Sequence, residues 1–180
     1  MSETLQLPSD KTYRTIVADP PWQYGDNLPG KRGAAHKYSV MQLDDICDLP
    51  VADIADPEGS HLYLWVTASF IQEGQRVLEA WGFTYKTMIT WVKTTKDGDK
   101  LAFGMGHYFR GCAEYVLFGT RGRLRVENRS LRNVILAPRT EHSRKPDAFY
   151  SFVEQASPGP RLEMFARRRI EDWDAWGLEV

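Results

Sequence analysis

The sequence predicts an α/β protein built on a mostly parallel, doubly wound sheet. Short apolar runs that suit buried strands alternate along the chain with amphipathic runs that suit helices. The chain has 180 residues, which is long enough to bury a full core as one domain, and we place that single domain over residues 1–180.

Nine elements follow one another in the order strand, helix, strand, helix, three strands, helix and strand. The strand runs are rich in β-branched and aromatic residues, whereas the helix runs carry apolar residues at helical spacing. The expected limits are 13–18, 40–47, 61–66, 70–81, 83–92, 114–118, 133–136, 146–155 and 162–165.

Capping signals fix the ends of the predicted helices. Ser39 opens a motif that resembles a capping box, and Ser69 caps the second helix, which Gly82 ends. Pro146 suits the first turn of the third helix, where a missing N–H costs nothing, and Asp147 stands beside it. The long glycine-bearing stretches 25–37 and 94–106 are predicted loops and candidates for the active site.

Composition narrows the class of protein. The N-terminus is polar and resembles no signal peptide, and no apolar run approaches the about 18 residues that span a bilayer, so we expect a cytoplasmic protein. Cys47 and Cys112 stand alone, and the four histidines lack metal-ligand spacing, so we expect no metal site.

Basic residues gather in one stretch of a chain whose net charge is only −1. Between Arg121 and Lys145 there are eight basic residues and two acids, and arginine dominates. Arginine suits phosphate recognition, so the stretch is a candidate contact for nucleic acid. Alternatively, this basic stretch is a solvated loop that keeps the protein soluble.

The most informative motif is an apolar run, 16–18, that stops at Asp19-Pro20-Pro21-Trp22. In open α/β sheets ligands bind at the carboxyl ends of strands, where Asp19 is expected. Proline fixes φ, so the carbonyl groups after Asp19 are held stiffly. An acid, a rigid carbonyl and an aromatic ring together suit a planar amine, although a simple turn would use the same residues.

A second cluster lies near the C-terminus. Lys145 stands at a predicted helix start, where a lysine could hold a carboxylate, and Glu163 lies in a strand, where an acid can bind ribose hydroxyls. No G-x-G-x-x-G fingerprint and no P-loop is present. Alone, this cluster is a weak signal, and an ordinary surface helix and strand is the simpler interpretation.

Together the two clusters resemble the adenine-N6 methyltransferases of the type found in the catalytic subunit of the eukaryotic mRNA methyltransferase complex, which have bacterial and phage relatives. The resemblance runs from about Tyr13 to the C-terminus. The residues that carry it are 18–22, Tyr38, Met41, 62–67, 89–93, Glu114, 142–147, 162–167 and 176–177.

This resemblance implies a Rossmann-like methyltransferase fold with a permuted motif order, in which the catalytic strand precedes the cofactor strand. It implies S-adenosylmethionine as the cofactor and N6-methyladenine in nucleic acid as the product. DNA is the expected substrate, with RNA as the alternative, and a homodimer or a related partner subunit is possible.

The resemblance also assigns roles to individual residues. Asp19 and the Pro20 carbonyl would accept hydrogen bonds from the exocyclic amine, and catalytic roles fall on Asp19, Pro20, Pro21 and Trp22. The expected substrate contacts are Tyr38, Trp91, Lys93 and Glu114. The expected cofactor contacts are Ser143, Lys145, Glu163, Arg167 and Glu179. Leu178 departs from the asparagine that relatives often carry there.

Two further hypotheses remain open from the sequence. The chain could be a non-catalytic nucleic-acid-binding subunit that supports an active relative, or it could methylate a small molecule or a protein. Trp91 could equally belong to the core, and Tyr38 could merely close a loop.

Overall fold

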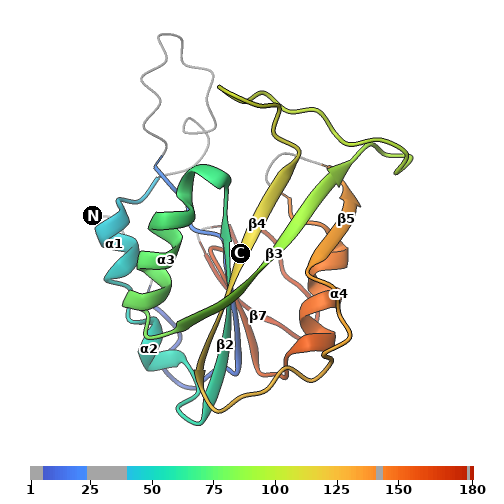
Figure 1. Ribbon diagram of the computed structural model, residues 1–180. Coiled ribbons are helices and arrows are strands. Elements are labelled where there is room, and N and C mark those ends of the chain that lie inside the picture. Colours follow the sequence, from blue (N-terminus) through green and yellow to red (C-terminus); the bar gives the residue numbers. More distant parts are fainter. Residues whose placement is uncertain (1–5, 24–39, 141–143, 178) are drawn as a thin grey trace.

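A computed structural model describes residues 6–23, 40–140, 144–177 and 179–180 of the chain. These residues form a seven-stranded sheet with the strand order β5-β3-β4-β2-β1-β6-β7, and helices cover both of its faces (Figure 1). The elements are β1 Thr15–Ala18, α1 Leu43–Cys47, α2 Val51–Ile54, β2 Gly59–Val66, the 3-10 helix η2 Ala68–Phe70, α3 Ile71–Ala80, β3 Thr84–Thr94, β4 Ala113–Gly122, β5 Val134–Pro138, α4 Asp147–Ala156, β6 Arg161–Met164 and β7 Asp174–Trp176.

The sheet is mostly parallel, which confirms the predicted fold class. Four neighbouring strand pairs are parallel, and β4 is antiparallel to both of its neighbours, β2 and β3. All the other strands therefore run in one direction. Their carboxyl ends lie at one edge of the sheet, where β4 begins and where a ligand site is expected.

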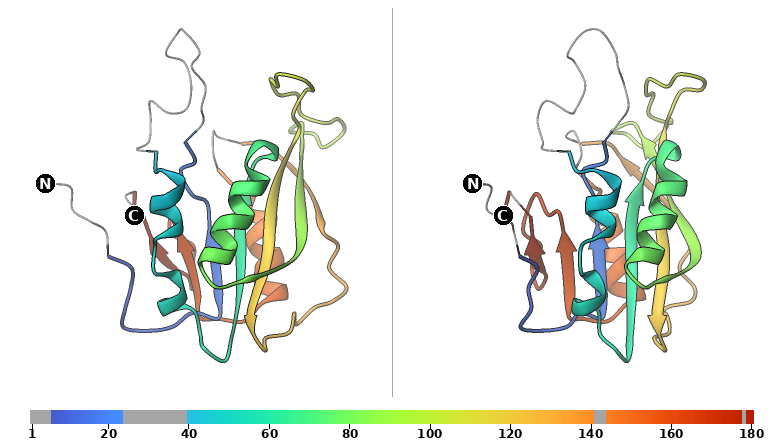
Figure 2. Two further views of the ribbon diagram at one scale, coloured as in Figure 1. Left: turned by 60° about the vertical axis from the view of Figure 1, so that its left-hand side comes forward. Right: turned by 90° about the vertical axis from the view of Figure 1, so that its left-hand side faces the viewer.

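Two hydrophobic clusters lie on the two faces of the sheet, because side chains alternate along each strand. Leu62 and Leu64 of β2 belong to the cluster under α1, α2 and α3, whereas Tyr63 and Trp65 belong to the cluster under α4. Figure 2 shows α1 and α3 on one side of the sheet and α4 on the other.

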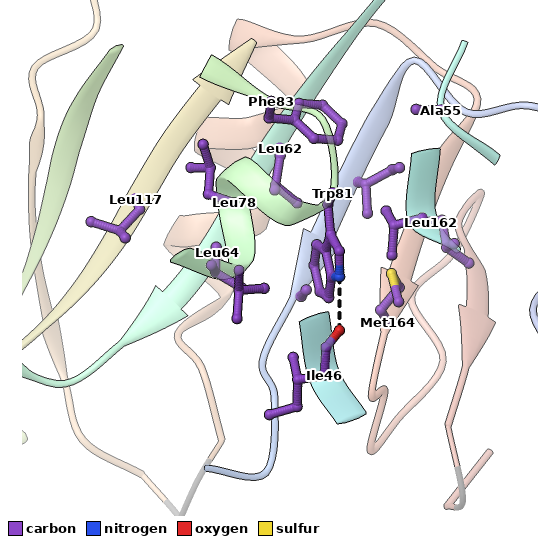
Figure 3. Packing of buried hydrophobic residues seen from close by; sticks show 14 of the residues in the cluster. Ile46, Ala55, Leu62, Leu64, Leu78, Trp81, Phe83, Leu117, Leu162 and Met164 are labelled. Carbon is purple, nitrogen blue, oxygen red and sulfur yellow. Dashed lines mark hydrogen bonds between the residues drawn. The ribbon is translucent and has the colours of Figure 1, made fainter. Parts of the chain in front are cut away.

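The first cluster is centred on Trp81, which is fully buried at the end of α3 (Figure 3). Its indole Nε1 donates a hydrogen bond to the Ile46 carbonyl at 2.8 Å, so the ring links α3 to α1. The hydrogen bond satisfies the one polar atom of a large apolar side chain, as a buried tryptophan requires. Packing of this kind fixes the helices against β2 and β1.

One predicted helix start and one predicted helix cap were wrong, for reasons that the backbone shows. The Met41 N–H donates to the Pro21 carbonyl at 3.1 Å, so this segment is tied to the chain after β1, and α1 begins only at Leu43. Before α3, a 3-10 turn takes up residues 68–70, and no side chain caps the helix. Gly82 follows α3 with φ of +82°, as predicted.

The two short elements α2 and β7 were not predicted. The four-residue helix α2 and the three-residue strand β7 lack the length from which a period can be read. β7 exists because it adds a parallel strand beside β6, a pairing that depends on tertiary structure. No helix among the described residues is both long and apolar enough to cross a membrane.

His61 is fully buried at the start of β2, and its hydrogen bonds define its tautomer. Nε2 lies 3.0 Å from the Leu124 carbonyl, which can only accept, so the proton is on Nε2. Nδ1 therefore accepts from the Ser157 hydroxyl at 2.7 Å, and the Ser157 oxygen accepts from Tyr63 at 2.6 Å. Burial lowers the pKa of His61, partly opposed by its hydrogen bond to the Leu124 carbonyl.

We expect the stability of the fold to depend on His61 at mildly acidic pH. Because its pKa is lowered in the folded state, the unfolded chain binds the proton more readily, and the free energy of unfolding falls as the pH drops below the ordinary value of 6.5. Urea unfolding at pH values on both sides of 6.5 measures this fall. In His61→Gln, which cannot titrate, the fall below pH 6.5 should be smaller; an equal slope in both proteins would contradict the assignment.

Candidate active site

Asp19 lies at the edge of the sheet where most strands end. It follows β1, which is paired on both sides, with β2 and with β6. The Trp22 N–H donates to the Pro20 carbonyl at 2.9 Å, which folds the chain back directly after Asp19. A carbonyl oxygen has two lone pairs, so the Pro20 carbonyl retains the capacity for one more hydrogen bond. The two prolines thus give Asp19 a stiff neighbour with a free acceptor position.

A chain of ion pairs joins Asp19 to three other predicted site residues. Lys145 Nζ lies 2.9 Å from Glu114 Oε2 and 3.4 Å from Asp19 Oδ2. Lys93 Nζ lies 3.2 Å from the other Glu114 oxygen. These residues come from the end of β1, the end of β3, the start of β4 and the segment before α4, so only the fold brings them together.

Burial and neighbouring charges oppose each other in this chain of ion pairs. Burial raises the pKa of Asp19 and Glu114 raises it further, whereas Lys145 and Arg167 lower it; the net shift is upward. Burial would also raise the pKa of Glu114, but Lys145 and Lys93 together hold that pKa below its usual value. Lys145 is itself buried, yet Asp19 and Glu114 raise its pKa, so it remains a cation.

Two aromatic residues assigned to the site are packed inside the protein. Trp22 is 6% exposed, stacks on Phe70 and donates from Nε1 to the Trp65 carbonyl at 3.1 Å. Trp91 is 2% exposed and donates from Nε1 to the Ala137 carbonyl at 3.0 Å. In this structure both rings are therefore part of the packing around the site, and their polar atoms are bonded to backbone carbonyls.

Trp65 was not among the predicted site residues, but it contacts one of them. Lys145 Nζ lies 4.4 Å from the centre of the Trp65 ring, and Lys93 Nζ lies 4.9 Å from that of Trp91. The two indoles meet edge to face, with their centres 6.0 Å apart. Each lysine therefore has an aromatic face on one side and carboxylates on another, an arrangement that favours the cation. Trp65 takes this position because β2 pairs with β1, a neighbour relation that the sequence does not show.

The residues assigned to the cofactor differ in how they are placed. Glu163 is buried in β6, and its Oε1 accepts a hydrogen bond from the Tyr150 hydroxyl at 2.5 Å. Its Oε2 is buried with no hydrogen-bond partner among the described residues. Arg167 is partly buried and Glu179 is exposed, whereas Tyr38, Ser143 and Leu178 lie outside the described residues.

The acceptor left open on Glu163 fits a nucleoside cofactor. A buried carboxylate oxygen without a donor is costly, and a ribose hydroxyl supplies such a donor. Burial raises the pKa of Glu163 and the charge of Asp19 raises it further, while the Tyr150 hydrogen bond opposes this rise. Lys145, a buried cation, adds a group suited to the cofactor's carboxylate. The open acceptor of Glu163 and the charge of Lys145 therefore fit the ribose and the carboxylate of S-adenosylmethionine.

The basic stretch 121–145 does not lie on one surface beside Asp19. Arg121 pairs in register with Ser60 at the start of β2, at the edge of the sheet opposite to Asp19, and it donates to the Ala52 carbonyl at 2.6 Å. Arg139 follows β5 and is exposed at the same edge as Asp19. The stretch thus divides between two ends of the molecule.

Comparison with known proteins identifies the family. A sequence model of the MT-A70 family matches residues 13–179. The chain belongs to the MT-A70 family. This MT-A70 member is 31% identical to the type II methyltransferase M.MunI of Mycoplasma sp, in an alignment that covers 97% of this chain and 80% of the relative.

Eukaryotic relatives of this MT-A70 chain are considerably longer. It is 32% identical to the human N(6)-adenosine-methyltransferase catalytic subunit METTL3 over 86% of this chain and 26% of the relative. It is 34% identical to the Arabidopsis thaliana N(6)-adenosine-methyltransferase MT-A70-like over 87% of this chain and 22% of the relative. The chain thus spans about a quarter of the length of these two relatives. The predicted class, an adenine-N6 methyltransferase, is confirmed at the level of the family.

Proposed function

We propose that this protein transfers the methyl group of S-adenosylmethionine to the exocyclic N6 amine of adenine in DNA. The observation that carries the proposal is the position of the Asp19 carboxylate at the end of β1, next to a fixed proline carbonyl and 3.4 Å from the buried Lys145 ammonium. The two N–H groups of the amine match two acceptors, the Asp19 carboxylate and the Pro20 carbonyl.

These acceptors address the main difficulty of the reaction. The lone pair of the adenine amine is delocalised into the ring, which makes the nitrogen a poor nucleophile. Hydrogen bonds to Asp19 and Pro20 would favour a more pyramidal nitrogen and aim its lone pair out of the ring plane. The protein therefore contributes mainly orientation and electrostatics, and no strong base is needed because the proton can leave after transfer.

Lys145 has two roles in this proposal. Its charge lowers the pKa of Asp19, which burial and Glu114 raise, so it helps to keep Asp19 ionised and able to accept. Ser143, Lys145, Glu163, Arg167 and Glu179 would hold the cofactor, with Lys145 on its carboxylate and Glu163 on its ribose. When bound, S-adenosylmethionine supplies a methyl group already activated by the sulfonium.

The target base has to leave its stack to reach Asp19. We propose that Tyr38, Trp91, Lys93 and Glu114 surround it, with Pro21 and Trp22 forming the wall beside the base. Because the Trp22 and Trp91 rings are packed inward, Lys93 and Glu114 are the described residues of this group whose charged side-chain atoms lie at the site.

DNA is proposed over RNA because of the relative that this chain matches over most of both lengths. That relative is a bacterial type II methyltransferase, whereas the relatives named for adenosine are covered over about a quarter. RNA methylation and a non-catalytic supporting role remain the alternatives that the experiment separates.

Transfer of a tritiated methyl group to adenine-containing DNA and RNA oligonucleotides, single-stranded and duplex, tests the proposal. We expect label in DNA that is recovered as N6-methyladenine after digestion to nucleosides. Label in RNA alone would replace the proposed substrate. No label in either, from folded protein that binds S-adenosylmethionine by calorimetry, would contradict the proposal; absence of both label and cofactor binding would favour the supporting subunit.

A further inference from the structure

The connection between β3 and β4 exposes large apolar side chains at the edge of the sheet that holds Asp19. Tyr108 is 93% exposed, Phe109 88% and Met105 86%, and Phe103 and Leu101 are exposed as well. We call residues 101–110 the aromatic loop. Five large apolar side chains exposed on one loop are more than scattered surface residues, and such a concentration often marks a binding site. In Figure 1 the connection extends beyond the end of the sheet.

Two glycines allow the backbone of the aromatic loop to fold closely on itself. A Cβ at Gly104 would clash with the Gly111 carbonyl oxygen, and one at Gly106 would clash with that of Phe109. At these two positions the chain approaches its own backbone so closely that only glycine fits.

The base of the connection is tied to the candidate active site. The Lys93 N–H donates to the Cys112 carbonyl at 2.7 Å, and the Ala102 N–H donates to the Lys93 carbonyl at 2.7 Å. Lys93 and Glu114, which belong to the chain of ion pairs with Asp19, thus stand at the two ends of the connection. A ligand that reached Asp19 along this edge would pass the aromatic loop.

The charges around the rings favour a polyanion. Lys96, Lys100 and Arg110 of this connection are exposed, and the Arg110 guanidinium lies over the Phe103 ring at 5.4 Å from its centre. Arg139 is exposed directly after β5, whose last residue pairs with Thr94 at the end of β3. The only described acids within the connection are Asp97 and Asp99. Exposed rings interleaved with basic side chains are the pattern of proteins that bind single-stranded nucleic acid.

We propose that the aromatic loop is a stacking platform for unpaired bases of the DNA strand that carries the target adenine. Tyr108 and Phe109 stack on bases next to the target, and Lys100, Arg110 and Arg139 contact the phosphates of that strand. Every base has an aromatic face, so such a platform holds an opened strand without selecting a sequence. The inference rests on the proposed function for its choice of ligand.

Single-ring variants test the platform by direct binding. The probe is a short fluorescein-labelled single-stranded oligodeoxynucleotide, and its Kd is measured by fluorescence anisotropy without cofactor. We expect Tyr108→Ala and Phe109→Ala each to raise Kd by about tenfold, the scale of losing one stacked base. Met105→Ala removes an equally exposed apolar side chain without a ring, so it should leave Kd nearly unchanged, and Tyr108→Phe should retain wild-type binding.

Two outcomes would overturn the platform. Unchanged Kd in both ring variants is one of them. The other is a wild-type dimer, seen by sedimentation velocity, that Met105→Ala weakens as much as Phe109→Ala does, because the loop would then bind a second copy through apolar area.

Methyl transfer by the wild type separates the platform from the proposed function. If the wild type labels DNA while the ring variants bind normally, the platform fails and the function stands. If the rings matter for binding but no nucleic acid is labelled, the proposed function fails and the stacking surface stands.

Discussion

Replacement of Asp19 with alanine is expected to lower kcat for methyl transfer to DNA by roughly 10²–10³-fold, the scale of losing one preorganised polar contact at the reacting atom. The carboxylate is proposed to accept from the amine that is methylated, so its loss affects the transition state more than the ground state. Steady-state kinetics with tritiated cofactor measure the change. Asp19→Asn should also be impaired, because it removes the negative charge and replaces one of the two acceptor oxygens with an NH2 donor of similar shape.

A matched control separates this role from a general loss of structure. Asp147 is an exposed acid at the start of α4 that pairs with Arg168, and Asp147→Asn should leave kcat near that of the wild type. Calorimetry should find cofactor binding in Asp19→Ala within a few-fold of wild type. A kcat close to wild type in Asp19→Ala would remove the basis of the proposed mechanism.

Replacement of Lys145 with methionine is expected to move the acidic limb of the activity profile to higher pH and to abolish most activity near neutrality. Asp19 must be ionised to accept from the amine, burial already raises its pKa, and Lys145 is the cation that most lowers it. Without Lys145 the carboxylate holds its proton to higher pH. The variant should also lose stability, by roughly 3 kcal/mol, since two partly buried carboxylates lose their shared cation.

Glu114→Gln provides the opposing test. The negative charge of Glu114 raises the pKa of Asp19, so its removal should move the acidic limb to lower pH. The profile of kcat against pH for the three proteins measures both shifts. General damage to the site would lower activity in both variants without opposite displacements, and displacements in the same direction would contradict the proposed coupling.

Local patterns predicted much of the fold, because burial imposes a period on the sequence. The strand around 61–66 shows this well: Leu62 and Leu64 pack on one face of the sheet and Tyr63 and Trp65 on the other, as an apolar run buried on both sides requires. Gly82 marked the end of α3 for an equally local reason. The start of α1 could not be read, because a backbone hydrogen bond between Met41 and Pro21 decides it over long range.

In the candidate site, too, local motifs identified the residues and long-range contacts decided their arrangement. Asp19 and Lys145 could be identified from their motifs, but their separation of 3.4 Å depends on the parallel pairing of distant strands. The inward packing of Trp91 and the contact of Trp65 with Lys145 also depend on which face of the sheet α4 covers. The loop predicted at 94–106 extends to residue 112 in the structure, and the exposure of its aromatic side chains is set by the folded backbone.

What the sequence determined alone was the fold class, the family and the chemical identity of the groups at the site, since these follow from residue types and from short-range periods. What only the tertiary structure decided was the proximity that gives those groups their properties. The ionisation of Asp19 is set by the burial, cations and acid that the folded sheet collects around it, and no stretch of sequence near Asp19 contains them.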